Sequence, residues 1–143
     1  MALALEAPPL AGVGRMAFAD LFLADIRAYR EEKLDAAGWE AVFPLWGRDT
    51  QALAHDFIDA GFKAVLVCVD PSQLDPAFVG RPFDEALLAD LPSGVDSCGE
   101  NGEFHTFVHA GPIFDHPVEI SLGEAVMRDG FAFQDVLPAR VAA

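Results

Sequence analysis

The chain of 143 residues is long enough for one domain or part of one, and 52% of its residues are hydrophobic. Its 23 acidic and 9 basic residues give a formal net charge of −14, which repels phosphate backbones and anionic lipid headgroups. We therefore expect neither a nucleic-acid partner nor a membrane partner. No apolar run approaches the roughly 20 residues that span a bilayer. Cys68 and Cys98 lie in unlike settings and form no disulfide framework, so the expected location is the reducing cytoplasm.

The first part of the chain alternates apolar strand patterns with amphipathic helix patterns. Residues 3–10 have the composition of a helix end, and residues 15–18 predict a short buried strand. Asp20 is expected to N-cap a helix over residues 21–36, and a second strand follows at 39–43. Apolar side chains recur at helical spacing along one side of this helix: Phe22, Ile26, Tyr29 and Leu34. Strand, helix and strand in so short a stretch predict a βαβ unit with parallel strands.

The same pattern then repeats. A helix over residues 50–60 is expected to be capped by Asp49 or Thr50, and the strand at 62–69 follows it. The strand's sequence, FKAVLVCV, is almost continuously apolar, which is typical of a strand covered on both faces. It is predicted to be a third parallel strand, and a short helix over residues 82–91 comes next.

The last part of the chain has a different character. Short strands joined by Gly-Pro and Asp-Gly turns are predicted at residues 103–109, 117–122, 125–127 and 131–136. Asp129-Gly130 is a good hairpin signal. The sequence therefore predicts an α/β fold whose partial open parallel sheet is followed by a small, mostly antiparallel subdomain. The expected division is 1–95 and 96–143.

Residues 96–107, DSCGENGEFHTF, carry the clearest signal of a functional site. Acids, an imidazole, a hydroxyl and two flexible backbone positions lie within a few residues of one another: Gly99, Glu100, Gly102, Glu103, His105 and Thr106. Glycine lets a backbone approach a ligand closely, and the side chains offer acid, base and hydrogen-bonding groups. Connecting loops seldom have this composition, so the segment is predicted to bind a ligand.

Each of these residues also has a simpler interpretation. Glu100 and Glu103 are either contacts to a bound ligand or solvated loop carboxylates. On a strand, Glu103, His105 and His109 share one face and have the chemistry of zinc ligands, but such a face is more often simply wet. We predict no metal site, and we predict that His105 donates hydrogen bonds or transfers protons. Cys98 is expected to pack rather than react.

Several segments together resemble a known family. They are FADLFLADIRAYRE (18–31), FPLWGRDT (43–50), the strand end at Val69-Asp70, FVGRPFD (78–84), DSCGENGEFHTFV (96–108) and GPIF (111–114). In these segments the chain resembles the diphthine–ammonia ligase family of adenine nucleotide alpha hydrolases, also called PP-loop ATP pyrophosphatases. The resemblance implies a Rossmann-like sheet, ATP and Mg²⁺ as cofactors, activation of a small-molecule or protein carboxylate by adenylation, and amidation by ammonia.

The resemblance also implies roles for particular residues. Asp20 and Trp46 follow strand ends, where open α/β sheets bind ligands, and are expected near the nucleotide. A helix cap for Asp20 and a pocket wall or interface for Trp46 are the alternatives. Arg81 is expected to bind a phosphate or substrate carboxylate, unless it pairs with a nearby acid. Catalytic roles are implied for Glu100, Glu103 and His105, and substrate contacts for Arg81, Gly99, Gly102 and Thr106.

The chain's main departure from the family concerns the pyrophosphate loop. The family's SGGxDS loop, whose amides hold pyrophosphate, has only a near-match at residues 93–97, SGVDS, which lacks the second glycine. We therefore expect a C-terminal portion that is inactive alone and depends on an N-terminal PP-loop segment. Strands at 15–18 and 62–69 are expected to leave an apolar edge and an apolar face uncovered, and so to cause self-association. The alternative function is a non-catalytic ligand-binding or oligomerisation module.

Overall fold

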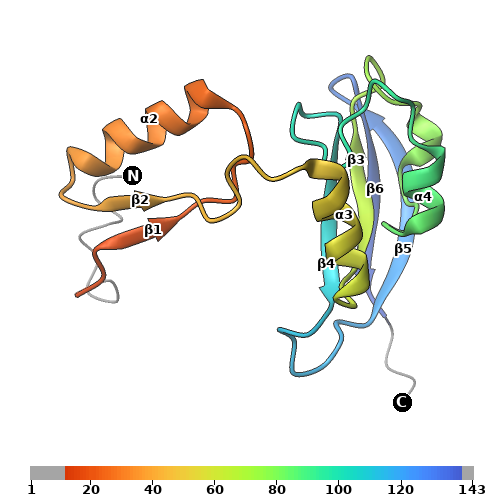
Figure 1. Ribbon diagram of the computed structural model, residues 1–143. Coiled ribbons are helices and arrows are strands. Elements are labelled where there is room, and N and C mark those ends of the chain that lie inside the picture. The colour runs from red at the N-terminus through yellow and green to blue at the C-terminus, as the bar shows by residue number, and fades with distance from the viewer. Residues whose placement is uncertain (1–11, 140–143) are drawn as a thin grey trace. The chain divides into compact units, whose positions relative to one another are not determined.

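The structure is a computed structural model that describes residues 12–139 of the chain (Figure 1). The helix end predicted at residues 3–10 lies outside the described residues. The chain separates into two compact units, Met1–Arg48 (unit 1) and Asp49–Ala143 (unit 2), and each is described by itself. The division predicted between residues 95 and 96 falls inside unit 2.

Unit 1 contains the predicted strand–helix–strand element. Strand β1 (Arg15–Ala17), helix α2 (Ala24–Asp35) and strand β2 (Glu40–Val42) follow one another along the chain. The two strands pair in parallel, with Met16 opposite Ala41, so the predicted βαβ unit is confirmed. Together with the antiparallel sheet of unit 2, this parallel pair confirms the α/β fold class.

Two predictions about α2 are wrong. The helix begins at Ala24, its N-cap residue is Leu23, and no side chain caps it, because Asp20 forms an ion pair with Arg30 instead. The predicted apolar face is also mostly exposed in the described part of unit 1. Of its four residues, Leu34 is fully buried, whereas Phe22, Ile26 and Tyr29 are exposed.

Unit 2 is built on a four-stranded antiparallel sheet with the order β4-β3-β6-β5. The sheet consists of β3 (Lys63–Val69), β4 (Phe104–Ala110), β5 (Ile120–Arg128) and β6 (Phe131–Pro138). The prediction that residues 62–69 form a third parallel strand is wrong, because β3 pairs antiparallel with β4 on one side and β6 on the other. The expectation of an exposed edge at these residues is wrong for the same reason.

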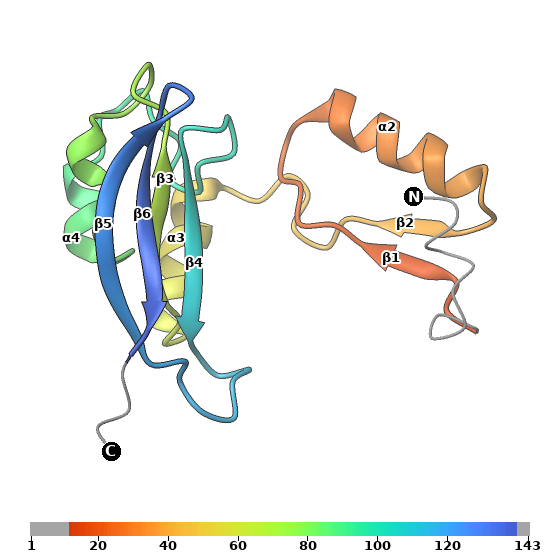
Figure 2. The same ribbon diagram turned by 180° about the vertical axis from the view of Figure 1, so that it is seen from behind.

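Two helices cover one face of this sheet (Figures 1 and 2). Helix α3 (Thr50–Asp59) is capped by Asp49, whose side chain accepts a 2.8 Å hydrogen bond from the Ala52 amide, as one of the two predicted alternatives. Helix α4 (Glu85–Asp90) follows a 3₁₀ turn, η2 (Pro76–Phe78), that was not predicted. No helix within residues 12–139 is long and apolar enough to cross a membrane.

The core of unit 2 lies between the helices and the sheet. It contains side chains from both helices, from β3, β4 and β6 and from the loops: Ala54, Ala64, Leu66, Val69, Leu74, Phe83, Leu87, Phe104 and Ala132. Because strand side chains alternate between faces, the neighbours of these residues along β3, β4 and β6 point to the opposite face. The sheet thus has one covered face and one face that neither helix covers.

The β5–β6 hairpin turns where the sequence predicts. Arg128 pairs with Phe131, so Asp129 and Gly130 form a two-residue loop, and both have positive φ, 52° and 87°. These angles are those of the type I′ turn that Asp-Gly favours. The two strands predicted at 117–122 and 125–127 are one strand, β5, with an irregular register between Leu122 and Ala125.

One polar contact between α3 and α4 makes the stability of unit 2 depend on pH. His55 Nδ1 lies 2.9 Å from Glu85 Oε1, and this hydrogen bond raises the pKa of His55 above its ordinary value. A raised folded-state pKa contributes stability that is fully present below the unfolded pKa of about 6.5 and is lost as pH rises through the folded pKa.

We therefore expect the NMR titration of the His55 imidazole to have a midpoint above that of a free histidine. The Glu85→Gln variant should return the midpoint to the ordinary range, because the charged acceptor is removed. The backbone amide of His116, an exposed residue in the segment before β5, serves as the internal control and should give the same NMR signal in both proteins. Equal His55 midpoints in the two proteins would show that the contact does not exist in solution.

Candidate functional site

The loop between α4 and β4, residues 96–103, is held together by two of its own carboxylates. The first is Asp96, whose Oδ1 accepts hydrogen bonds from the backbone amides of Cys98 (2.9 Å) and Glu100 (3.1 Å). The Asp96 carbonyl also accepts the Gly99 amide at 3.0 Å. Such side-chain-to-backbone bonds fix a turn that no regular secondary structure supports.

The second carboxylate, Glu103, is the most unusual group in unit 2. It is only 2% exposed, and it is the one buried charged residue among those the structure describes. Its Oε1 accepts the Asp96 amide (2.9 Å) and the Asn101 Nδ2 amide (3.0 Å), while Oε2 accepts the Asn101 backbone amide (3.0 Å). A buried carboxylate requires such donors. The structure therefore gives Glu103 the task of closing the loop, and its predicted catalytic role stays a prediction.

Cys98 lies inside the loop, where its thiol is half-buried and hydrogen-bonded. Its thiol donates to the Thr50 carbonyl at the start of α3, with an Sγ–O distance of 3.2 Å. Burial, followed by the nearby charges of Asp96 and Glu100, raises the pKa of Cys98 to about 11. Because the thiolate is the reactive form, a thiol with this pKa is a poor nucleophile near neutral pH. Its packing role agrees with the expectation from the sequence.

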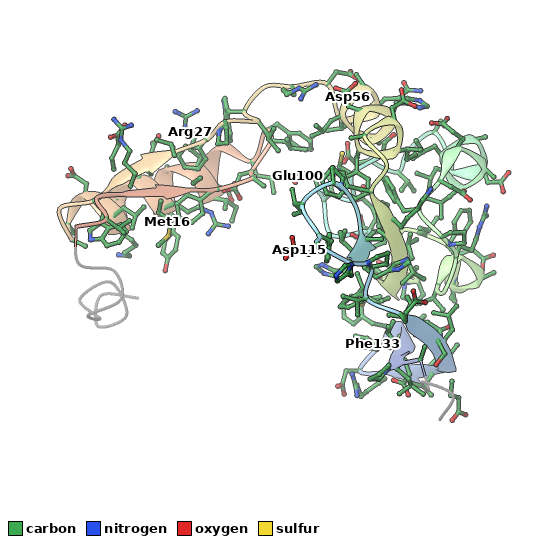
Figure 3. All side chains as sticks on the ribbon, turned by 90° about the horizontal axis from the view of Figure 1, so that it is seen from below. Met16, Arg27, Asp56, Glu100, Asp115 and Phe133 are labelled. Atoms are coloured by element: carbon green, nitrogen blue, oxygen red, sulfur yellow. The ribbon has the colours of Figure 1, made fainter. Side chains whose placement is uncertain are left out.

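The remaining predicted residues of this segment lie at or after the loop. Glu100 projects from the loop that leads into β4 (Figure 3), and its backbone amide is fixed by Asp96. His105 and Thr106 are exposed residues of β4. They point to opposite faces of the sheet because they are neighbours on a strand, so a single bound ligand would meet them from different sides.

Arg81 lies apart from this loop. Its Nη2 donates to Asp90 Oδ2 at 2.8 Å, and its guanidinium carbon lies 4.8 Å from the centre of the Phe78 ring. These contacts correspond to the simpler alternative, pairing with a nearby acid. Arg81 as a phosphate or carboxylate ligand stays a prediction, and binding in that way would require it to leave Asp90.

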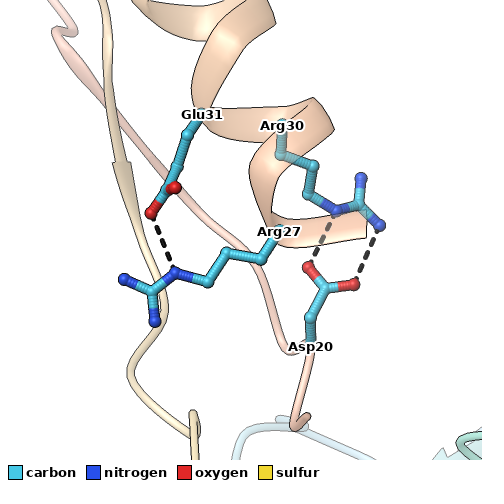
Figure 4. A network of polar contacts seen from close by, with 4 residues as sticks. All are labelled: Asp20, Arg27, Arg30 and Glu31. Atoms are coloured by element: carbon cyan, nitrogen blue, oxygen red, sulfur yellow. Dashed lines mark hydrogen bonds and ion pairs between the residues drawn. The ribbon is translucent and has the colours of Figure 1, made fainter. Parts of the chain in front are cut away.

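Unit 1 brings Asp20 and Trp46 to neighbouring segments. The Gly47 amide donates to the Leu21 carbonyl at 2.8 Å, so the segments that follow β1 and β2 lie side by side. Asp20 contacts Arg30 in a two-point ion pair, with Nε–Oδ2 at 2.8 Å and Nη2–Oδ1 at 3.2 Å (Figure 4). The sequence did not single out Arg30.

Aromatic rings support the two arginines of α2. The Arg30 guanidinium lies 4.4 Å from the centre of the Phe18 ring. The Arg27 guanidinium lies 4.8 Å from Phe43 and 4.7 Å from Trp46, and it also donates to Glu31 (Figure 4). Trp46 is therefore a packing surface for an arginine within unit 1, and the expectation that it contacts a nucleotide stays a prediction. The spacing of Arg27 and Arg30, three residues apart on one helix, was the available sequence signal.

The described residues offer no metal centre. Within residues 12–139, no group of three or more His, Cys, Asp or Glu side chains is placed to hold a metal ion. The carboxylate of Glu103, one of the three groups considered as zinc ligands, is turned into the loop.

Comparison with known proteins gives this loop and sheet a family context. Residues 49–136 match the family described as the diphthamide synthase C-terminal domain. The chain belongs to this family. The matched stretch begins where unit 2 begins and contains all four strands of its sheet up to the last residues of β6.

Curated relatives share this region. The diphthine–ammonia ligase of Bos taurus is 33% identical over 97 residues, which are 64% of this chain and 36% of that protein. The Mus musculus protein of the same name is 33% identical over 102 residues, 68% of this chain and 38% of that protein. The Schizosaccharomyces pombe protein is 27% identical over 93 residues, 62% and 15% respectively. The chain spans less than two fifths of each of these relatives, and the resemblance predicted from its motifs is confirmed.

Proposed function

We propose that unit 2 is the substrate-side part of an amide-forming ligase that joins ammonia to a carboxylate. The observation that carries the proposal is the closed loop 96–103, which belongs to the matched family region and presents polar groups beside β4. The substrate class follows from the name of the relatives, diphthine–ammonia ligase.

In this proposal the loop residues divide into two groups. The carboxylates of Asp96 and Glu103 accept hydrogen bonds from backbone amides of the loop, so these two residues act as positioning residues. Glu100 and His105 contact the substrate carboxylate region and the incoming ammonia. As the C–N bond forms, the substrate carbon must lose its bond to an oxygen leaving group, which the nucleotide-handling part would have to supply. The nitrogen of ammonia, which attacks as a neutral molecule, loses a proton, and an imidazole or carboxylate near the reacting carbon would accept it. Two other expected substrate contacts lie away from this pair, because Thr106 points to the opposite face of the sheet from His105 and Arg81 pairs with Asp90.

ATP and Mg²⁺ are implied by the family resemblance, but the described residues do not fit a bound pyrophosphate. In the near-match at residues 93–97, the Val95 amide already donates to Pro92 and the Asp96 amide to the buried Glu103 carboxylate. A pyrophosphate cradle needs such amides free and convergent. The nucleotide-handling part has to come from elsewhere, either another polypeptide or sequence joined to this one.

Binding of a diphthine-bearing peptide tests the substrate side directly. We expect backbone NMR signals of residues 99–106 to shift when the isotope-labelled chain is titrated with this peptide, and to stay in place with the same peptide carrying unmodified histidine. Glu100→Gln and His105→Asn should each weaken binding about tenfold, the effect of losing one charge-assisted hydrogen bond. His116→Asn, at an exposed histidine outside the loop, is the matched control. Equal binding of both peptides would contradict the proposal.

A second measurement concerns the nucleotide. We expect the purified chain to release no AMP from ATP and Mg²⁺, since the described amides near residue 95 are already bonded. The assay is AMP formation followed by chromatography, with boiled protein as the control. AMP release above that control would show that these residues do form a nucleotide site. Failure of the diphthine peptide to bind, together with no AMP release, would favour the non-catalytic alternative.

A further inference from the structure

Figure 2 shows the sheet from the face that α3 and α4 leave uncovered, and several apolar side chains gather on that face. It carries an open groove of about 710 Å³ whose floor includes Val67, Phe107, Phe131 and Phe133. Phe107 and Phe131 are each 39% exposed. An antiparallel sheet with one solvated face normally presents polar side chains there, and contiguous exposed apolar surface marks interaction sites.

The groove is a built feature of the strand register. Leu66 pairs with Thr106 and Cys68 with His105, so Val67 is an extra residue on β3. This bulge directs both Val67 and Cys68 to the uncovered face, where they line the groove. Apolar side chains on β4 and β6 extend the same surface, so three adjacent strands contribute to it.

The shape of the groove favours a polypeptide over a small molecule. Small-ligand sites are concave and bury most of the ligand's surface. This groove is open along its length and is lined from strand to strand across the sheet, which is the form of surface that accepts a segment of another chain.

The charge around the groove indicates the kind of segment. Between residues 49 and 139 the sequence has 16 Asp and Glu and only 3 Lys and Arg, so this stretch of unit 2 accounts for −13 of the chain's formal net charge of −14. One acid, Asp135, lines the groove. Two more are close to lining residues: Asp129 follows Arg128 in the hairpin turn, and the charge of Asp70 acts on Cys68. Hydrogen bonds from Ser72 and then Gln73 lower the pKa of Asp70, which keeps it ionised.

Among residues 12–139, Arg128 is the one Lys or Arg side chain that lines the groove. Its guanidinium carbon lies 4.5 Å from the centre of the Phe133 ring, so one aromatic face already holds a cation. Phe107 and Phe131 are the exposed rings that remain for an incoming side chain.

We propose that this groove docks a segment of another protein in which apolar side chains are flanked by lysine or arginine. The apolar groups cover the exposed phenylalanines, and the basic groups meet the acids around the groove. A second copy of this chain is disfavoured as the occupant, because it would bring a surface of the same strong negative charge against this one.

The test uses the full chain and two synthetic peptides, one alternating leucine and lysine and one alternating leucine and glutamate. We expect the basic peptide to bind, to weaken as salt is raised, and to shift the NMR signals of groove residues, whereas the acidic peptide does not bind. Phe131→Ser and Phe107→Ser should each weaken binding at least tenfold. Ile113→Ser is the matched control, because Ile113 is 80% exposed and lies outside the groove.

The Arg128→Gln variant distinguishes a basic partner segment from an acidic one, and it changes no residue of the apolar core. A basic segment should bind this variant equally well or more tightly, since a like charge is removed. Loss of binding in Arg128→Gln, or equal binding of both peptides, would overturn the proposal. So would basic-peptide binding that is unchanged in Phe131→Ser, because the peptide would then use another acidic surface. A concentration-dependent dimer that disappears in Phe131→Ser would assign the groove to a second copy instead.

Discussion

Replacing Glu103 by alanine is expected to destabilise unit 2 by about 2–4 kcal/mol, because several loop donors lose their acceptor at once. The Glu103 carboxylate is the acceptor for two backbone amides, those of Asp96 and Asn101, and for the Asn101 side chain. A donor left unsatisfied in a buried position costs about 1–3 kcal/mol. Glu103→Gln keeps one acceptor oxygen and should cost less, although its new N–H groups face donors.

The measurement is urea unfolding followed by circular dichroism of the sheet. Tryptophan fluorescence reports on a different part of the chain, since Trp39 and Trp46 both belong to unit 1. Glu124→Ala is the control, because Glu124 is an exposed carboxylate on β5 and its loss should change the free energy of unfolding by less than about 0.5 kcal/mol. A Glu103→Ala protein as stable as the control would mean that this carboxylate does not close the loop in solution. Loss of diphthine-peptide binding should accompany the loss of stability.

Local sequence signals predicted the elements that local interactions determine. Asp49 caps α3 with its own side chain, and Asp129-Gly130 forms the hairpin turn, because each depends on contacts within a few residues. The βαβ element of unit 1 could be predicted for a related reason. The hydrophobic pattern gives a strand, a helix and a strand in succession, and two strands joined by a helix of this length pair in parallel.

The direction of β3 could not be predicted in the same way. An almost continuous apolar run indicates that both faces of a strand meet apolar surroundings, but it contains no information on which strands pair with it. Its partners, β4 and β6, are formed by residues far along the chain. One face of β3 packs under the helices and the other forms the floor of the groove, which accounts for the apolar run without a parallel sheet.

Composition predicted where the candidate site lies, but it did not predict which contacts the side chains of that loop make. A glutamate in a polar, glycine-rich loop is expected to be solvated, and only the fold shows that Glu103 turns inward to accept the loop's amides. Asp20 is a comparable case. Its position before a helix predicts a cap, but Arg30, ten residues later, provides a charged partner that competes with the helix amides. Both predictions needed distances that a local pattern does not contain.

Gly99→Ala is the second substitution expected to have a large effect, and Gly102→Ala is its matched control. Both glycines belong to the loop and both have positive φ, 69° at Gly99 and 85° at Gly102. A left-handed conformation costs a non-glycine residue about 1–3 kcal/mol, so both variants carry this strain. At Gly99, however, an added Cβ would lie 2.8 Å from the Phe104 carbonyl oxygen, whereas at Gly102 it would meet no atom within 4 Å.

The two variants should therefore separate backbone strain from close packing. We expect Gly102→Ala to lower the free energy of unfolding by about 1 kcal/mol and Gly99→Ala by about 2–4 kcal/mol, since the second also forces the loop away from the start of β4. Gly99→Ala should in addition disturb the amide signals of Cys98 and Glu100, whose hydrogen bonds to Asp96 depend on the position of the loop. Equal losses in the two proteins would mean that conformational strain alone sets the cost. The loop would then not be packed against β4, and its residues would have no fixed position from which to contact a substrate.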